Sequence, residues 1–143
     1  MARQYGAYHV LPADSDVPLE FSKLNNDRGA DVVIVCAAAE AVCRQAFQAV
    51  GRGGVILLFA PTPADTEVPL SINDVFWRRD VSVTTSYAAS PGDCADALEL
   101  IRSKRVRVDD MITHRLGLAD TGEGFRLVAE GGNSLKVIIK PQE

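Results

Sequence analysis

The chain has 143 residues, 47% of them hydrophobic, and its 15 basic and 19 acidic residues leave a formal net charge of -4. This balance predicts one ordinary soluble domain with a core of its own. It offers no basic surface for nucleic acid, and its apolar runs are far shorter than a membrane span, so we expect neither partner.

The first thirty residues predict only short elements. Residues 1–6 resemble the last turn of a helix that ends at Gly6, and residues 9–11 are expected to form a very short strand. Apolar residues then recur at helical spacing and predict a short helix, with an acidic or hydroxyl residue before it as the N-cap. These are Val17, Phe21 and Leu24 for the helix, and Asp14, Ser15 or Asp16 for the cap.

Residues 31–60 predict a strand, a helix and a second strand, and the rest of the chain is organised around them. The β-branched run at residues 32–36 is typical of a parallel strand that is buried on both faces. An apolar stripe then predicts a helix that ends at the glycine-rich residues 51–54, and residues 55–59 predict the next strand. Ligands of such sheets bind beyond the carboxyl ends of the strands, which here are residues 36–38 and 59–61.

The second half continues with alternating elements. Residues 81–87 are β-branched and partly polar, which predicts a strand near the sheet edge. Ser90, Pro91 and Asp93 form a strong helix start, and that helix is expected to bury a stripe of four residues. A last helix over residues 120–130 and a strand over residues 135–140 complete the chain. The expected stripe consists of Cys94, Ala97, Leu98 and Ile101.

The cysteines number three, an odd count at spacings that fit neither a zinc site nor a disulfide framework. Two of Cys36, Cys43 and Cys94 lie in apolar surroundings, so we expect buried thiols there. Residues 1–8 show no signal-peptide pattern, and we therefore expect a cytoplasmic setting.

The order of these motifs resembles the medium-chain, zinc-dependent alcohol dehydrogenases, and most nearly their sorbitol and threonine dehydrogenase branch. The resemblance rests on residues 31–36, 51–54, 112–115 and 135–141. It implies an α/β fold: a partial Rossmann domain with a doubly wound, mainly parallel sheet that lacks the first two strands and the Gly-rich loop. Residues 1–143 would then be a single truncated dinucleotide-binding domain, without the family's Cys, His and Glu zinc ligands.

The resemblance also implies positions for the cofactor, which would be NAD or NADP, bound weakly or not at all. Two residues would line the adenine-ribose side, three would flank the nicotinamide, one would lie near the substrate and one would reach the pyrophosphate. Each has a plainer interpretation: a strand terminus, a core tyrosine or an exposed lysine. In that order they are Cys36 and Ala37; Phe59, Ala60 and Pro61; Tyr87; and Lys136.

Three functions remain open at this point. The chain is the carboxyl-terminal part of an NAD(P)-dependent alcohol or polyol dehydrogenase, inactive alone and without bound zinc; or a non-enzymatic module that dimerises or completes a partner; or another Rossmann-like enzyme such as a methyltransferase. An apolar patch predicts a homo-oligomer, although it could instead cover the chain's own sheet. The patch consists of Leu70, Ile72, Val75, Phe76 and Trp77.

We interpret His114 as a structural histidine, and Arg78 and Arg79 as a pair of solvated charges.

Overall fold

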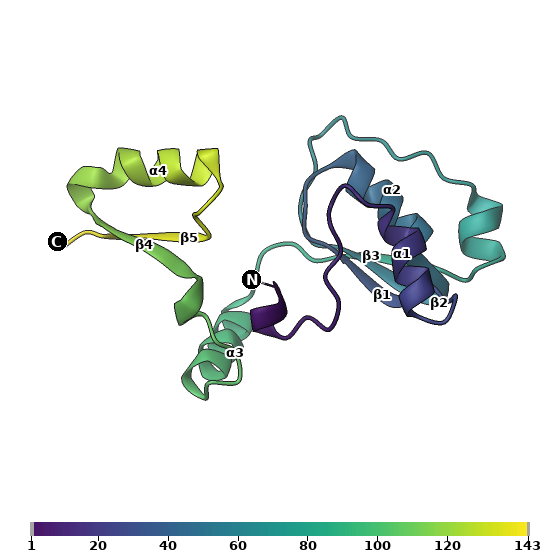
Figure 1. Cartoon of the computed structure of the whole chain (residues 1–143), viewed down its shortest axis with the longest axis horizontal. Helices are drawn as coiled ribbons and strands as arrows, with labels where there is room; N and C mark the ends of the chain where they lie inside the picture. The colour runs from purple at the N-terminus through teal and green to yellow at the C-terminus, as the bar shows by residue number, and fades with distance from the viewer. Residues whose placement is uncertain (1, 143) are drawn as a thin grey trace. The chain divides into compact units, whose positions relative to one another are not determined.

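The computed structural model describes residues 2–142, which separate into two compact units that meet between Ala88 and Ala89 in sequence (Figure 1). The first unit holds, in chain order, η1 (Ala2–Tyr5), α1 (Val17–Leu24), β1 (Ala30–Val35), α2 (Glu40–Ala49), β2 (Val50–Leu58), the π-helical η2 (Asn73–Trp77) and β3 (Ser82–Thr85). The second holds α3 (Pro91–Arg102), η3 (Asp109–Met111), β4 (Ile112–Gly117), η4 (Leu118–Asp120), α4 (Thr121–Glu130) and β5 (Lys136–Lys140).

The first unit is built on a three-stranded sheet in the order β1-β2-β3, and every pair of strands is parallel. Val33, Ile56 and Val83 lie in register across it. Helix α2 connects β1 to β2, so the predicted strand-helix-strand unit is confirmed. Within the described residues β3 pairs with β2 alone, which confirms an edge strand.

The core of this unit lies between the sheet and α2. Val35 and Ile56 are 1% and 0% exposed, and Cys43 and Ala46 of α2 are buried against them. Burying one aliphatic side chain of this size stabilises a fold by about 1.5–3 kcal/mol. Helix α1 packs against α2 on the same side of the sheet (Figure 1).

The other face of β1 is open. Val32 and Ile34 are 60% and 55% exposed, whereas Val35, one residue further along, is buried. The prediction that this strand is buried on both faces is therefore wrong for the first unit taken by itself. The physical reason is that α1 and α2 lie on the same side, and no other described element of this unit covers Val32 and Ile34.

The glycine-rich residues 51–54 belong to β2 and do not form the turn that we expected after the helix. Helix α2 ends at Ala49 and β2 begins at Val50. The register jumps from Ala30 beside Val50 to Val32 beside Val55, so β2 bulges between these points. Gly53 supplies the positive φ, +71°, that this detour requires.

The amino-terminal elements agree only in part with the prediction. Asp16 caps α1: its carboxylate accepts a hydrogen bond from the Leu19 amide at 3.2 Å. Residues 9–11, by contrast, form no strand, so that prediction is wrong. A strand needs a neighbour to satisfy its backbone groups, and none of the described strands lies beside these residues.

The second unit contains a two-stranded parallel sheet, β4-β5, with α4 packed against it. The final helix and strand were predicted, but β4 was not. Gly124 of α4 is buried against Val137 and Ile139, where an added Cβ would meet the Ile139 side chain at 3.1 Å. Close helix-sheet packing therefore favours glycine at this position.

Helix α3 begins as predicted, with a reciprocal capping box between Ser90 and Asp93. Its expected buried stripe is wrong: Leu98 and Ile101 are 68% and 40% exposed, and Cys94 is exposed too. No element of the second unit packs over this stripe closely enough to bury it.

Among the described residues, no helix has the length and apolar character that a membrane crossing requires.

Candidate ligand-binding site

A cavity of about 630 Å³ lies at the carboxyl ends of β2 and β3. Helix α2 contributes one wall through Cys43 and Phe47, and the loop after β2 contributes Val68 and Leu70. Phe76 of η2 lines the cavity as well. This is the edge of a parallel sheet at which α/β proteins bind their ligands.

Four of the predicted site residues line this cavity. Phe59, Ala60 and Pro61 follow β2 directly, and Tyr87 follows β3. The backbone holds them in place: the Phe59 and Ala60 amides donate hydrogen bonds to the Val35 carbonyl at 3.1 and 2.9 Å. The end of β1 therefore fixes the direction in which the loop leaves β2.

The other three predicted residues do not line it. Cys36 and Ala37 follow β1 and are exposed. Lys136 opens β5 in the second unit, where its side chain is exposed and its carbonyl accepts a hydrogen bond from the Thr113 hydroxyl at 3.2 Å. Their cofactor roles stay predictions.

Several cavity residues were not predicted as site residues, or were expected elsewhere. Phe47 lies in the helix predicted between the two strands, Val83 in the predicted edge strand, and Cys43 among the thiols, but none of these patterns marked them as site residues, and Val68 carried no signal. Leu70 and Phe76 were expected in a contact between subunits, yet they are partly buried against the core of their own unit. The apolar pattern at Leu70 and Phe76 indicates that these side chains are buried, but it does not indicate whether the same chain or a second subunit buries them.

The five-residue patch is therefore divided. Val75 is 8% exposed and belongs to the core, together with the partly buried Leu70 and Phe76. Ile72 and Trp77 are 60% and 82% exposed. The alternative that the patch covers the chain's own sheet holds for three of its members, and only two remain available to a partner.

The cavity is apolar and uncharged. None of the described side chains that line it carries a formal charge, and their polar groups are five hydroxyls and the Cys43 thiol. Within the described chain no hydrogen bond engages the hydroxyls of Thr85, Ser86 or Tyr87, so all three are available to a ligand. The hydroxyl-bearing residues are Thr62, Thr66, Thr85, Ser86 and Tyr87.

A second cavity, of about 470 Å³, lies at the opposite end of the sheet and is polar. Arg79 lines it and is half-buried, so its description as a solvated charge is wrong. Its guanidinium donates to the Phe47 carbonyl at 3.0 Å and to the Val50 carbonyl. These carbonyls lie at the carboxyl end of α2, where carbonyl groups have no partner inside the helix. The Arg79 side chain therefore caps the carboxyl end of α2.

The thiols also differ from expectation. All three are free, and only Cys43 is buried, at 6% exposure, whereas Cys36 and Cys94 are exposed. Both exposed cysteines sit on surfaces that the sequence pattern marks as apolar. Apolar neighbours in sequence therefore did not guarantee cover in space.

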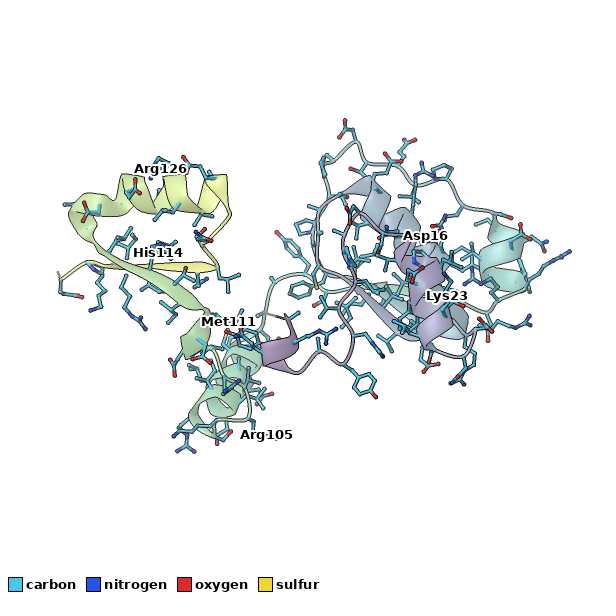
Figure 2. All side chains as sticks on the ribbon, in the orientation of Figure 1. Asp16, Lys23, Arg105, Met111, His114 and Arg126 are labelled. Atoms are coloured by element: carbon cyan, nitrogen blue, oxygen red, sulfur yellow. The ribbon has the colours of Figure 1, made fainter. Side chains whose placement is uncertain are left out.

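The ionic pairs of α4 are exposed to solvent, and Figure 2 labels the residue that they share, Arg126. The Arg126 guanidinium contacts Glu123 at 2.5 Å and Glu130 at 2.7 Å. The hydrogen bond from Arg126 lowers the pKa of Glu123, and both carboxylates raise the pKa of Arg126. All three side chains are exposed, so water screens the attraction between their charges.

His114 on β4 forms a hydrogen bond through Nδ1 with the Thr113 hydroxyl at 3.0 Å, as expected of a structural histidine.

The parallel sheet, the connecting helix on one face and the cavity at the carboxyl ends define a Rossmann-like α/β protein. A family model described as zinc-binding dehydrogenase matches residues 1–103. The chain therefore belongs to the zinc-binding dehydrogenase family. The predicted family and partial fold are confirmed, and the methyltransferase alternative falls away.

Individual proteins resemble the chain in sequence or in fold. The chain is 29% identical to D-xylulose reductase of Saccharomyces cerevisiae, over 99% of this chain and 41% of that protein. Its fold matches an alcohol dehydrogenase of Thermotoga maritima with a TM-score of 0.87 at 18% identity, over 98% of this chain and 39% of that one. It matches an Escherichia coli alcohol dehydrogenase complexed with NADH with a TM-score of 0.81 at 16% identity, over 98% and 40%. The chain thus spans about two fifths of the length of these proteins.

Proposed function

We propose that this chain supplies the nicotinamide-facing wall of an NAD(P)-dependent alcohol or polyol dehydrogenase. The observation that carries the proposal is the convergence of Phe59, Ala60, Pro61 and Tyr87 on one cavity. The family assignment and the NADH complex of a protein with the same fold support it. The cytoplasmic setting, and the grouping of residues 1–143 into one domain, stay predictions.

The cavity fits one part of a dinucleotide and not another. A neutral dihydronicotinamide ring suits uncharged apolar walls, whereas a pyrophosphate would lose its hydration there without gaining a charged partner. The phosphates would therefore stay outside the cavity. Lys136 remains the candidate for them on the resemblance alone.

The chain's own residues would position the reactants. In the direction that forms the alcohol, a bound reduced nicotinamide would supply the hydride to the carbonyl carbon, and the oxygen that becomes the alcohol hydroxyl would take its proton from solvent water. The walls formed by Phe47 and Leu70 exclude water from the ring, and the hydroxyls of Ser86 and Tyr87 can orient the alcohol oxygen. Zinc does not fit: among the described residues no three His, Cys, Asp or Glu side chains gather to hold a metal.

The proposal predicts a weak, localised cofactor interaction. Reduced nicotinamide mononucleotide, titrated into ¹⁵N-labelled protein, should shift the amides of residues 59, 60 and 87. We expect an affinity for whole NAD or NADP no better than about millimolar, or roughly 4 kcal/mol. Shifts confined to residues outside the cavity would contradict the proposal.

Ala60 provides a sharper test. Ala60 lines the cavity beside Phe59. Ala60→Gly removes a methyl group from the wall and should strengthen binding of the mononucleotide. Ala64→Gly in the same loop is the control, because Ala64 is exposed and does not line the cavity. Equal effects of both substitutions would show that loop flexibility, and not space for the ring, controls binding.

The isolated chain should show no alcohol or polyol dehydrogenase activity, with or without added zinc. The reason is that it supplies neither a gathered metal-ligand set among its described residues nor a Gly-rich phosphate loop. Steady-state NADH formation from pure protein and a panel of alcohols, measured against a buffer blank, tests this. Formation above the blank would contradict it.

We also propose that the chain associates with itself, and that Trp77 contributes to the contact. Trp77 is 82% exposed and Ile72 is 60% exposed; Trp77 ends η2 and Ile72 directly precedes it. Light scattering at high concentration should show a mass above 15.4 kDa, and Trp77→Ala should lower it. If the association survives that substitution, the open edge of β1 becomes the contact; a clean monomer at high concentration would end the proposal.

A further inference from the structure

The walls of the cavity at the carboxyl ends of β2 and β3 select the chemistry of what can enter. Phe47, Leu58, Leu70, Phe76 and Val83 surround it with hydrocarbon. A charged group placed among them would give up its hydration without an ionic partner, at a large cost in free energy. The cavity therefore discriminates against carboxylates and phosphates.

The polar groups of the cavity are few and similar. Apart from the Cys43 thiol, its polar side-chain groups are hydroxyls, which both donate and accept hydrogen bonds but carry no charge; they belong to Thr62, Thr66, Thr85, Ser86 and Tyr87. Thr85 and Ser86 lie at the end of β3, and Tyr87, at 90% exposure, stands at the rim. Together with Thr62 and Thr66 of the loop after β2, they can satisfy a hydroxyl or carbonyl group on that side of the ligand, whereas the opposite wall offers hydrocarbon. A polyol that enters fully would place its other hydroxyls against Phe47 and Leu70, where they would remain unpaired.

The volume sets the size of the ligand. A space of about 630 Å³ falls within the range of small-molecule sites and holds one or two rings. Phe59 and Phe76 can contact such rings through offset or edge-to-face stacking.

We infer that the cavity binds uncharged ring compounds that carry a single hydroxyl or carbonyl group, such as an aromatic alcohol, in preference to polyols. The inference rests on the proposed function only where it equates this ligand with the alcohol substrate. Binding itself needs no cofactor.

Benzyl alcohol is the probe, with benzoate as its charged counterpart and sorbitol as a polyol. Each is titrated into ¹⁵N- and methyl-labelled full chain. Benzyl alcohol should shift the signals of Leu58, Leu70 and Val83 in a saturable manner and bind at least tenfold more tightly than benzoate or sorbitol. Comparable affinity for all three, or tighter binding of sorbitol, would overturn the inference.

A cavity-filling variant locates the site. Val83→Phe places a ring in the cavity from an edge strand and should weaken benzyl alcohol at least tenfold. The matched control is Val128→Phe, which fills a smaller apolar cavity of about 240 Å³ beside α4 and should leave the affinity unchanged. If Val83→Phe loses its dispersed NMR spectrum, Thr85→Phe serves instead, because Thr85 lines the same cavity at an exposed position. A loss with the control variant alone would place the ligand elsewhere and reject the inference.

The two proposals fail separately. If reduced nicotinamide mononucleotide shifts residues 59, 60 and 87 while benzyl alcohol does not bind, the inference about the substrate is wrong and the proposed function stands. If benzyl alcohol binds and the mononucleotide does not, the inference stands and the proposed function loses its support.

Discussion

Gly29 is the position at which a single added carbon should disturb the sheet most directly. A Cβ built on Gly29 would lie 2.5 Å from the Gly51 nitrogen, 2.6 Å from the Gly51 Cα and 2.7 Å from the Val50 carbonyl carbon. Carbon atoms normally approach each other to about 3.5–4.0 Å, so the ends of β1 and β2 would have to part by about 1 Å. The obstructing atoms belong to the backbone, and no side-chain rotation can relieve the contact.

The expected cost follows from that displacement. Overpacking of this kind costs about 1–3 kcal/mol, and a broken backbone hydrogen bond adds about 1 kcal/mol. We therefore expect Gly29→Ala to lower the unfolding free energy of the first unit by about 2–4 kcal/mol. For a unit of this size, each kcal/mol corresponds to about 4–8 °C in Tm.

Urea unfolding followed through the methyl signals of Val35 and Ile56 measures this effect, because both side chains are buried in the first unit. Gly122→Ala is the control: nothing lies within 4 Å of the position that its added methyl group would take in α4, and the first unit should not respond. A Gly29→Ala variant within about 0.5 kcal/mol of the parent, the usual range for harmless surface changes, would refute the close approach of β1 and β2.

Three further predictions concern helix ends. Asp16→Ala should destabilise α1 by about 1 kcal/mol, measured by urea unfolding, because it removes the N-cap acceptor. Arg79→Lys should cost about 1–3 kcal/mol, since an ammonium cannot hold the Phe47 and Val50 carbonyls together as the guanidinium does, whereas the exposed Arg78→Lys should be neutral in the same assay. Hydrogen bonds from the Ser90 backbone amide, then its hydroxyl, lower the pKa of Asp93. This cap should therefore be complete above the ordinary pKa of aspartate and be lost as the pH falls through the lowered value; carboxyl NMR titration should show Ser90→Ala moving that pKa part of the way back up.

Local chemistry made the helix starts predictable. Asp16 and the Ser90–Asp93 capping box act within one turn, so their residue types and spacing are sufficient. The bulge at residues 51–54 depends on the register between β1 and β2, which is set by a distant part of the chain. Glycines that permit a close approach of two strands have the same sequence pattern as glycines that end a helix, and only the fold distinguishes them.

The candidate site was predictable to the same extent. The rule that ligands bind at the carboxyl ends of parallel strands identified Phe59, Ala60 and Pro61, because it depends only on where a strand ends, whereas Tyr87 was predicted from the family resemblance. The opposite walls come from α2, from the loop and from η2. Their positions follow from how the chain folds back over the sheet, and no short motif records that path.

The contrast between Ile34 and Val35 shows why an apolar run alone does not determine burial. The two residues are adjacent and both are β-branched, yet one is 55% exposed and the other 1%. Their side chains point to opposite faces of the sheet, and only one face is covered within the first unit. An apolar run of this kind is typical of strands with cover on both sides. The sequence therefore carries the pattern of a doubly covered sheet, and the uncovered face at Val32 and Ile34 is where further polypeptide would add burial that the first unit does not provide by itself.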